Sequence, residues 1–291
     1  MSFCAIVAVR QNEENAPDFP INFIRDWALL WQRRTNMLIH FYRNATMKLE
    51  YGGKVFLVDP MFRGKGVVHK LGPTLYPEKP PLIDLPEDGK TIADGIDAVL
   101  LTHLHPGHFD QEAADLIPKD LPFFVQNLND KDLSRKYGMN KTQTIDMTLD
   151  THLDDIRIIR TAGLHGNGKI MHVINTMQNS SGIVLKKEKE KAVFITGDTV
   201  YCSGVEAALG YHPDVIIAYL GANQGEGMQL TMGTEDLDKL QAAAPNAKIV
   251  AVHMETFENQ HLSRQEVRAY AESHNFSDRL IIPENGETVT L

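Results

Sequence analysis

Short apolar runs separated by turn residues begin at Met37 and continue to the C-terminus. The first three cover residues 37–42, 45–51 and 54–58, and Gly52-Gly53 joins the second run to the third as a hairpin. Runs of this length that are rich in β-branched and aromatic residues are typical of β-strands. Nine further runs predict strands in the same way: residues 98–102, 123–126, 156–161, 182–186, 192–196, 215–220, 249–252, 281–282 and 288–291.

Helix signals fall between the later runs. Asp110 and Glu112 mark the start of one helix and Pro118 its end, while Asp130 caps a second helix that Gly138 ends. Three more helices are predicted at residues 203–209, at residues 234–244, and after the capping box Ser263-Arg-Gln-Glu266. A first part made of strands, followed by strand and helix alternation, predicts two sheets packed face to face with helices outside both.

The N-terminal 36 residues differ from the rest of the chain. Residues 10–20 are polar and contain two prolines, and residues 21–34 carry apolar positions near helical spacing. We therefore expect an N-terminal extension, residues 1–36, made of an arm and a helix, in front of one domain that spans residues 37–291. The helix packs on this domain or on a neighbouring subunit, or else it lies on a membrane surface; its short length and mixed charge favour packing.

Residues 61–90 contain five prolines and no strand or helix pattern. A loop this long inside a domain is usually functional or disordered. Because it follows directly from a strand end, we expect it to cover the substrate and to supply specificity.

Composition narrows the class of protein. A net charge of −9 over 291 residues argues against general nucleic-acid binding, because phosphate contacts need clustered Lys and Arg. Two cysteines, Cys4 and Cys202, exclude a disulfide framework and fit a reducing compartment. No run approaches the roughly 18 apolar residues of a membrane span, and residues 3–9 lack the flanks of a signal peptide. We expect a cytoplasmic protein that acts on a small molecule and binds neither nucleic acid nor membrane.

The strongest chemical signal is Thr102-His103-Leu-His105-Pro-Gly-His108-Phe-Asp110. Its three histidines directly follow an apolar strand, and Pro106-Gly107 imposes a turn between them. This arrangement holds the imidazoles around one point, which suits a divalent metal and serves packing poorly.

Further ligand-type residues follow other apolar strands. His165 lies in a Gly-rich loop after residues 156–161, Asp198 lies in Thr196-Gly-Asp-Thr199, and His253 ends residues 249–252. Each of them alone is more typical of a structural histidine or a turn. Because strand ends converge on one edge of a layered fold, four separate segments are expected to deliver six groups to one metal site.

This order of motifs resembles the metallo-β-lactamase superfamily over residues 37–291, and the resemblance implies a four-layer αββα sandwich of mixed sheets. Within the superfamily the chain resembles the group that contains ascorbate-6-phosphate lactonase and related metal-dependent hydrolases. Five motifs carry the narrower resemblance: Leu57-Val-Asp-Pro60, Thr196-Gly-Asp-Thr-Val-Tyr-Cys202, Leu230-Thr-Met-Gly-Thr234, Val252-His-Met-Glu255 and Ile282-Pro-Glu-Asn-Gly-Glu287.

The resemblance implies a cofactor of one or two divalent ions, zinc or manganese. His103, His105 and His165 would hold the first ion. Asp198 would bridge to the second, which His108 and His253 would also face, and Asp198 and His253 are the candidate catalytic residues. Asp59 matches an early aspartate of the family that orients the site without binding the metal.

One position departs from the family pattern. The family has His-x-His-x-Asp-His, and this chain has Gly107 in place of the aspartate. Losing that carboxylate should weaken the second metal position. Three consequences are open: Asp110 substitutes for the missing ligand, the site holds a single ion, or the protein has lost activity.

The leading function is hydrolysis of a small ester, lactone or phosphorylated metabolite by a metal-activated water. The alternatives are a small-molecule phosphodiesterase and a metal-binding protein with reduced or lost catalysis. His261, just before a helix cap, is a candidate substrate contact and equally typical of a surface histidine. The sequence leaves the metal, the substrate and the oligomeric state open, homo-oligomers included.

Overall fold

The computed structural model describes residues 37–68, 78–145, 151–165, 180–225 and 227–291. The predicted N-terminal arm and helix, residues 1–36, lie outside the described residues. So do residues 69–77 of the predicted long loop.

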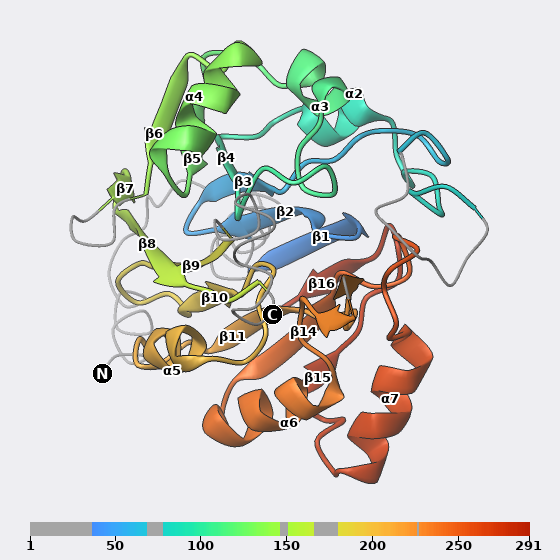
Figure 1. Ribbon diagram of the computed structural model, residues 1–291. Coiled ribbons are helices and arrows are strands. Elements are labelled where there is room, and N and C mark those ends of the chain that lie inside the picture. The colour runs from blue at the N-terminus through green and yellow to red at the C-terminus, as the bar shows by residue number, and fades with distance from the viewer. Residues whose placement is uncertain (1–36, 69–77, 146–150, 166–179, 226) are drawn as a thin grey trace, which may run out of the picture. The chain divides into compact units, whose positions relative to one another are not determined.

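Two seven-stranded sheets form the centre of the described chain (Figure 1). The first has the order β16-β1-β2-β3-β4-β5-β6 and the second β15-β14-β11-β10-β9-β8-β7. The strands of the first sheet are β1 (Leu38–Arg43), β2 (Thr46–Tyr51), β3 (Lys54–Val58), β4 (Ala98–Leu100), β5 (Pro122–Val125), β6 (Lys141–Thr144) and β16 (Thr288–Thr290). Those of the second are β7 (Thr151–Leu153), β8 (Ile156–Ala162), β9 (Ser181–Lys186), β10 (Val193–Ile195), β11 (Val215–Tyr219), β14 (Lys248–Val252) and β15 (Leu280–Ile281).

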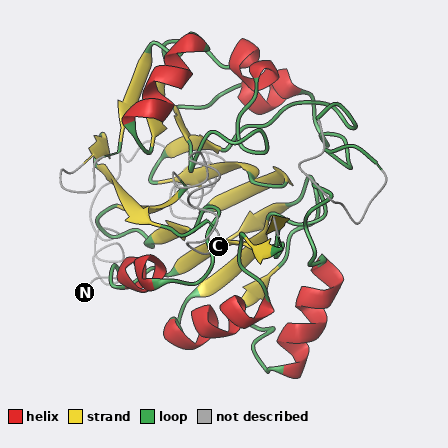
Figure 2. Ribbon diagram, in the orientation of Figure 1, coloured by secondary structure: helices red, strands yellow, loops and turns green. Residues whose placement is uncertain are grey.

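Helices cover the outer face of each sheet (Figure 2). On the first sheet lie α2 (Gly89–Ala93), α3 (Gln111–Leu116) and α4 (Leu128–Lys136); on the second lie α5 (Ser203–Leu209), α6 (Thr234–Ala243) and α7 (Arg264–Ser273). A short hairpin of β12 (Gln224–Gly225) and β13 (Met228–Gln229) stands apart from both sheets. This is the αββα sandwich that the sequence predicts.

Side-chain alternation along the strands divides the core into layers. In β3, Phe56 and Val58 point between the sheets and join the central cluster, which also holds Ile183 and Val193 of the second sheet. Leu57 points the other way, into the cluster beneath α2 and α3. A matching cluster lies between the second sheet and α5, α6 and α7. Successive side chains of a strand point to opposite faces of the sheet. Both faces of each sheet are apolar here, because one packs on the other sheet and the other on helices.

The parallel strands of each sheet end at one edge, where the predicted site residues follow. β3, β4, β5 and β6 pair in parallel, as do β10, β11, β14 and β15. β8 runs in the same direction as β10, because both are antiparallel to β9. Loops that leave the carboxyl ends of parallel strands therefore meet in one place.

The sequence missed several short elements. The edge strands β6 and β7 have the sequences KTQT and THL, which lack an apolar run, and α2 has only five residues, inside and just after the segment predicted as a loop. The cap of α4 was also predicted wrongly. Asn127 is the N-cap, since its side chain accepts from the backbone N of Asp130, so the helix begins two residues before Asp130.

Two buried charged residues, Arg43 and Asp110, hold the long loop at its start, and Arg43 also holds it at Ile83. The guanidinium of Arg43 donates to the carbonyl oxygens of Met61, Arg63 and Ile83, and the carboxylate of Asp110 accepts from the backbone N of Phe62 and of Arg63 at 2.8 Å each. Burial lowers the pKa of Arg43 to about 10, against the charge of Asp110. In the described part of the chain, no helix is long and apolar enough to cross a membrane.

Candidate metal centre

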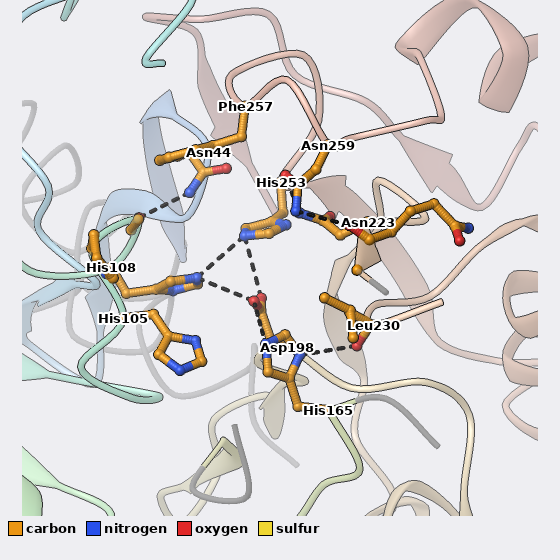
Figure 3. Close-up of a pocket in the computed structure, with 14 residues that line it drawn as sticks. Asn44, His105, His108, His165, Asp198, Asn223, Leu230, His253, Phe257 and Asn259 are labelled. Atoms are coloured by element: carbon orange, nitrogen blue, oxygen red, sulfur yellow. Dashed lines mark hydrogen bonds and ion pairs between the residues drawn. The ribbon is translucent and has the colours of Figure 1, made fainter. Parts of the chain in front are cut away.

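Five strand ends bring the predicted ligands together (Figure 3). His103, His105 and His108 follow β4, and His165 follows β8. Asp198 follows β10 and His253 follows β14. Asp59 follows the fifth strand, β3, and its Oδ2 lies 2.9 Å from Nδ1 of His108.

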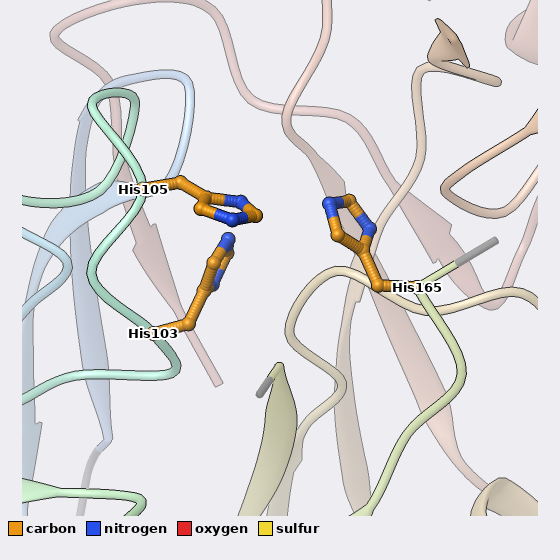
Figure 4. A group of neighbouring side chains, drawn as sticks. All are labelled: His103, His105 and His165. Carbon is orange, nitrogen blue, oxygen red and sulfur yellow. The ribbon is translucent and has the colours of Figure 1, made fainter. Parts of the chain in front are cut away.

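Two groups of side chains have the spacing that a metal requires. Ligand atoms of His103, His105 and His165 lie within 4.8 Å of one another, and so do those of His103, His108 and Asp198 (Figure 4 shows the first group). The structure thus brings together the three histidines that the sequence assigns to one ion.

Asp198 stands at the centre of the cluster and contacts four imidazoles. Its Oδ2 lies 3.4 Å from Nε2 of His108, 3.7 Å from Nε2 of His103 and 3.8 Å from Nε2 of His165, and its Oδ1 lies 3.3 Å from Nε2 of His253. Two ligand atoms that each lie about 2.1 Å from one tetrahedral ion are about 3.4 Å apart. The spacing of the cluster therefore fits a zinc-sized ion.

Unsatisfied polar atoms give a second test of that fit. Nε2 of His103 and Oδ1 of Asp198 are buried and have no hydrogen-bond partner among the described residues. A buried polar atom without a partner is costly in a native protein. Imidazole nitrogen and carboxylate oxygen are ligands of zinc and related ions, so a divalent ion would satisfy both atoms.

Hydrogen bonds behind the cluster fix the direction of the imidazoles. Nδ1 of His108 lies 2.9 Å from Oδ2 of Asp59, and Nδ1 of His165 lies 3.0 Å from the carbonyl oxygen of Leu230. Each contact occupies the far nitrogen of the ring and leaves Nε2 facing Asp198. The contact with Asp59 fixes the direction of the His108 ring. The orienting role at a bound metal, which the family resemblance implies for Asp59, stays a prediction.

The backbone is held in an unusual conformation at two residues of the site, Asp59 and His253, and at Asn44, whose backbone oxygen accepts from the backbone N of His253 at 2.8 Å. Asn44, Asp59 and His253 have φ angles of 53°, 42° and 70°, in the left-handed region that residues other than glycine rarely adopt. Such conformations persist where surrounding contacts enforce them, and they concentrate at functional sites.

Burial keeps most of the imidazoles neutral. It lowers the pKa of His165, lowers that of His253 to about 4, and lowers that of His103 well below its ordinary value with help from the neighbouring histidines. Since only the neutral ring binds a metal, these three side chains are in the required form at neutral pH.

The remaining pair carries opposite charges. Burial alone would raise the pKa of Asp198, but the surrounding imidazoles, His253 and His108 first, lower it well below its ordinary value. Burial alone would lower the pKa of His108, but the carboxylates of Asp198 and Asp59 outweigh it and raise that pKa to about 10. A metal ion bound to Nε2 of His108 would replace this proton as the counter-charge of the two carboxylates.

Tyr219 is a residue of the site that the sequence motifs did not predict. Its hydroxyl donates to Oδ2 of Asp59 at 3.0 Å, and its ring stacks on that of His253 with centroids 5.3 Å apart. The signal was present, because Tyr219 is the polar-tipped last residue of an apolar strand at the edge where the ligands gather. Tyr219 therefore positions groups on both sides of Asp198.

The Tyr219→Phe variant is expected to keep the fold and to bind Zn²⁺ about 10-fold more weakly, as is typical when a partner behind the ligands is lost. The ring stack remains, whereas Asp59 loses one donor and holds His108 less firmly. Competition with a chelating dye measures the dissociation constant. Tyr51→Phe is the matched control, because Tyr51 is also buried but its hydroxyl donates to the carbonyl oxygen of Leu185, which is not part of the metal site. Equal affinities for the two variants would contradict the positioning role of Tyr219.

Two predicted candidates are placed elsewhere by the structure. Asp110 caps α3: its Oδ1 accepts from the backbone N of Ala113, and its Oδ2 holds the backbone of Phe62 and Arg63. Both oxygens are engaged by main-chain donors, so the structure argues against Asp110 as a substitute ligand. His261 is exposed and does not line the cavity at the cluster, so the structure does not support it as a substrate contact.

A cavity of about 330 Å³ opens onto the cluster. Besides the metal-site residues, its walls come from the turn at Asn44, from the segment of β12 and β13, and from the loop after His253. The residues of these walls are Asn44, Asn223, Gln224, Gly225, Leu230, Phe257 and Asn259. The prediction that residues 61–90 cover the substrate is not supported for their described part, none of which lines this cavity. The loop instead lies behind Phe257, against which Met61 and Val68 pack.

Known proteins share both the sequence and this architecture. A family model described as the beta-lactamase superfamily domain matches residues 55–254. The UPF0173 protein YddR of Bacillus subtilis is 37% identical over 251 residues, which cover 85% of this chain and 97% of the relative. A possible metal-dependent hydrolase from Veillonella parvula has a solved structure that is 34% identical with a TM-score of 0.83, covering 88% of this chain and 99% of that one. The structure of an isothiocyanate hydrolase from Delia radicum gut bacteria is 30% identical with a TM-score of 0.82 and the same coverage.

The chain therefore belongs to the beta-lactamase superfamily and, within it, to the UPF0173 family of metal-dependent hydrolases. This confirms the superfamily that the histidine, Thr-Gly-Asp and late-histidine motifs indicate. Neither YddR nor the two solved relatives is named as an ascorbate-6-phosphate lactonase. The narrower resemblance to that group therefore stays a prediction.

Proposed function

We propose that this protein hydrolyses a small uncharged electrophile at carbon, with an isothiocyanate as the leading substrate class. The observation that carries the proposal is the cavity at the cluster: apart from the His and Asp side chains of the metal site, its described lining contains amide and apolar groups and no Lys or Arg. Beyond a metal ion, proteins usually hold a phosphorylated metabolite or a phosphodiester with Arg or Lys, and the described lining offers neither. The lining thus favours the neutral esters and lactones of the sequence-based hypothesis over its phosphorylated substrates.

The metal and the side chains divide the chemistry. The His and Asp side chains of the cluster would hold a divalent ion, which would lower the pKa of a bound water toward about 7 and polarise the bond that is attacked. Oδ2 of Asp198 lies 3.4–3.8 Å from Nε2 of His103, His108 and His165, so its carboxylate is placed beside the metal position to hold the attacking water. The side-chain amides of Asn223 and Asn259 line the cavity, each with one NH₂ hydrogen in a long 3.3 Å contact. Their remaining hydrogens can stabilise negative charge that develops on the substrate.

An isothiocyanate suits this arrangement. Its central carbon is electrophilic and uncharged, and water adds there to give a thiocarbamic acid, which breaks its carbon–nitrogen bond to release an amine and carbonyl sulfide. The similarity to the isothiocyanate hydrolase from Delia radicum gut bacteria, at 30% identity, supports this class. An ester or lactone would be attacked by the same water at its carbonyl carbon.

A substrate panel tests the proposal. Protein loaded with Zn²⁺ or Mn²⁺ is assayed with allyl and benzyl isothiocyanate, a γ-lactone, p-nitrophenyl acetate and bis(p-nitrophenyl) phosphate. We expect kcat/KM for an isothiocyanate at least about 100-fold above that for the phosphodiester, a difference of roughly 3 kcal/mol in transition-state binding. Dialysis against a chelator should abolish this activity, and metal should restore it. Turnover of the phosphodiester alone would establish the phosphodiesterase alternative, and tight metal binding without turnover of any member would establish a metal-binding protein.

A further inference from the structure

The backbone conformation at position 107 does not require a glycine. Its φ lies outside the left-handed region, so another residue could adopt the same backbone conformation. Space is the constraint. A Cβ added to Gly107 would lie 3.2 Å from both Cε2 and Cζ of Phe257 and 3.4 Å from Nδ2 of Asn44. Ordinary contacts between carbon atoms are about 3.5–4.0 Å, so the ring of Phe257 fills the space that a side chain would need.

The ring cannot move aside freely. Phe257 is 5% exposed and packs against Met61 and Val68, which are 0% and 5% exposed. Its backbone N donates to Oε1 of Gln260 at 2.9 Å. The loop behind the ring is in turn fixed by Arg43, whose guanidinium donates to the carbonyl oxygen of Met61 at 3.3 Å.

Asn44 fixes the opposite side of the contact. Its Nδ2 donates to the carbonyl oxygen of Gly107 at 2.9 Å, and its Oδ1 accepts from Nε2 of Gln260, also at 2.9 Å. One hydrogen-bonded chain thus joins the turn of Gly107 to the loop of Phe257. Figure 3 shows Asn44 and Phe257 beside the turn that carries His108.

We infer that Gly107 and Phe257 form a matched pair, and that Phe257 determines substrate specificity by presenting an apolar wall beside His108 and His253. Beside Gly107, where the family has an aspartate, this chain places the aromatic ring of Phe257. The wall packs against an apolar substituent on the electrophile and disfavours a charged one. The specificity half of this inference rests on the proposed function; the pairing of the two residues does not.

The pairing is tested by thermal unfolding of metal-free Gly107→Ala, Phe257→Ala and the double variant. Gly107→Ala should lower Tm by about 4 °C, because overpacking a rigid site costs stability and chains of this size lose about 2–4 °C per kcal/mol. In the Phe257→Ala background the same change should leave Tm within about 1 °C. Gly64→Ala is the matched control, since Gly64 also lies outside the left-handed region and a Cβ there meets nothing within 4 Å. Equal effects of Gly107→Ala in the two backgrounds would overturn the pairing.

Specificity is tested with homologous substrates that carry methyl, allyl and benzyl substituents, in the class that the panel shows to be turned over. Wild-type protein should prefer benzyl to methyl, and Phe257→Ala should reduce this ratio of kcat/KM about 10-fold, with Phe257→Leu between the two. If the benzyl-to-methyl ratio of kcat/KM is unchanged in Phe257→Ala while the Tm values still show the pairing, the ring has only a packing role. That result would overturn the specificity half of the inference. If no member of the panel is turned over, the result counts against the proposed function. Benzyl and methyl analogues would then be compared by equilibrium binding to wild type and to Phe257→Ala. An unchanged ratio of the two dissociation constants would overturn the specificity half.

Discussion

The Asp198→Asn variant is expected to lose its bound metal and its hydrolytic activity together. Asp198 is the only carboxylate in the two groups of metal-ligand spacing among the described residues, and it lies within 3.8 Å of four imidazole nitrogens. Asparagine keeps the shape but removes the negative charge that offsets the charge of a dication. We expect metal affinity to fall by more than about 100-fold, beyond the 10–100-fold typical of a lost partner behind the ligands.

Elemental analysis after dialysis measures this effect, in parallel with kcat/KM on the best substrate of the panel. Folding of the variant is checked by its Tm without metal. We expect this Tm to equal that of metal-free wild type or to exceed it. Asp132→Asn, an exposed aspartate on α4, is the matched control and should retain wild-type metal content. Asp198→Asn protein that keeps its full complement of metal would show that the ion is bound elsewhere.

The histidine cluster could be predicted because its signals are local. Three histidines after an apolar strand, with Pro106-Gly107 between them, define a turn without knowledge of the rest of the fold. His165, Asp198 and His253 could be added because each follows an apolar strand, and the ends of parallel strands converge. The two sheets followed from the same strand runs, whereas β6 and β7 were missed since edge strands need no continuous apolar face.

The surroundings of the cluster could not be predicted in the same way. Asn44 lies 63 residues from Gly107 and 216 residues from Gln260 in the sequence, and only the completed fold joins them. No local sequence pattern marks Phe257, because its role depends on Gly107, which lies far away in the sequence. From the sequence alone, Gly107 indicates a lost metal ligand. In the structure, the ring of Phe257 lies where a side chain at Gly107 would begin.

Asp110 illustrates how two local interpretations of one residue compete. The sequence places it both at a helix start and next to a histidine cluster, and either role uses its carboxylate. In the structure its oxygens accept from three backbone N atoms, at 2.8 Å each, and burial raises its pKa. The helix-cap signal was therefore the stronger of the two, because main-chain donors are fixed in place while a ligand role required the side chain to turn toward His108.

Replacing Asp110 with alanine is expected to destabilise the fold severely and to leave metal binding intact. Three buried or half-buried N–H groups would lose their acceptor, and the buried guanidinium of Arg43 would lose a nearby negative charge. Unsatisfied donors and uncompensated buried charge together should lower the free energy of unfolding by about 4 kcal/mol and Tm by about 10 °C. Asp110→Asn keeps one acceptor and should fall between alanine and wild type.

Denaturant unfolding measures the loss of stability, and elemental analysis of the folded fraction gives the metal per chain. Glu112→Gln is the matched control, because Glu112 is an exposed acid two residues away whose contact with Nε of Arg63 spans 3.0 Å. An exposed pair of this kind contributes about 0–1 kcal/mol, so this variant should unfold almost as wild type does. The opposite pattern, with Asp110→Ala at wild-type stability but short of metal, would make Asp110 a ligand after all. It would mean that the main-chain bonds to Phe62, Arg63 and Ala113 give way when the ion binds, and that the long loop is released from Asp110 in the metal-loaded protein.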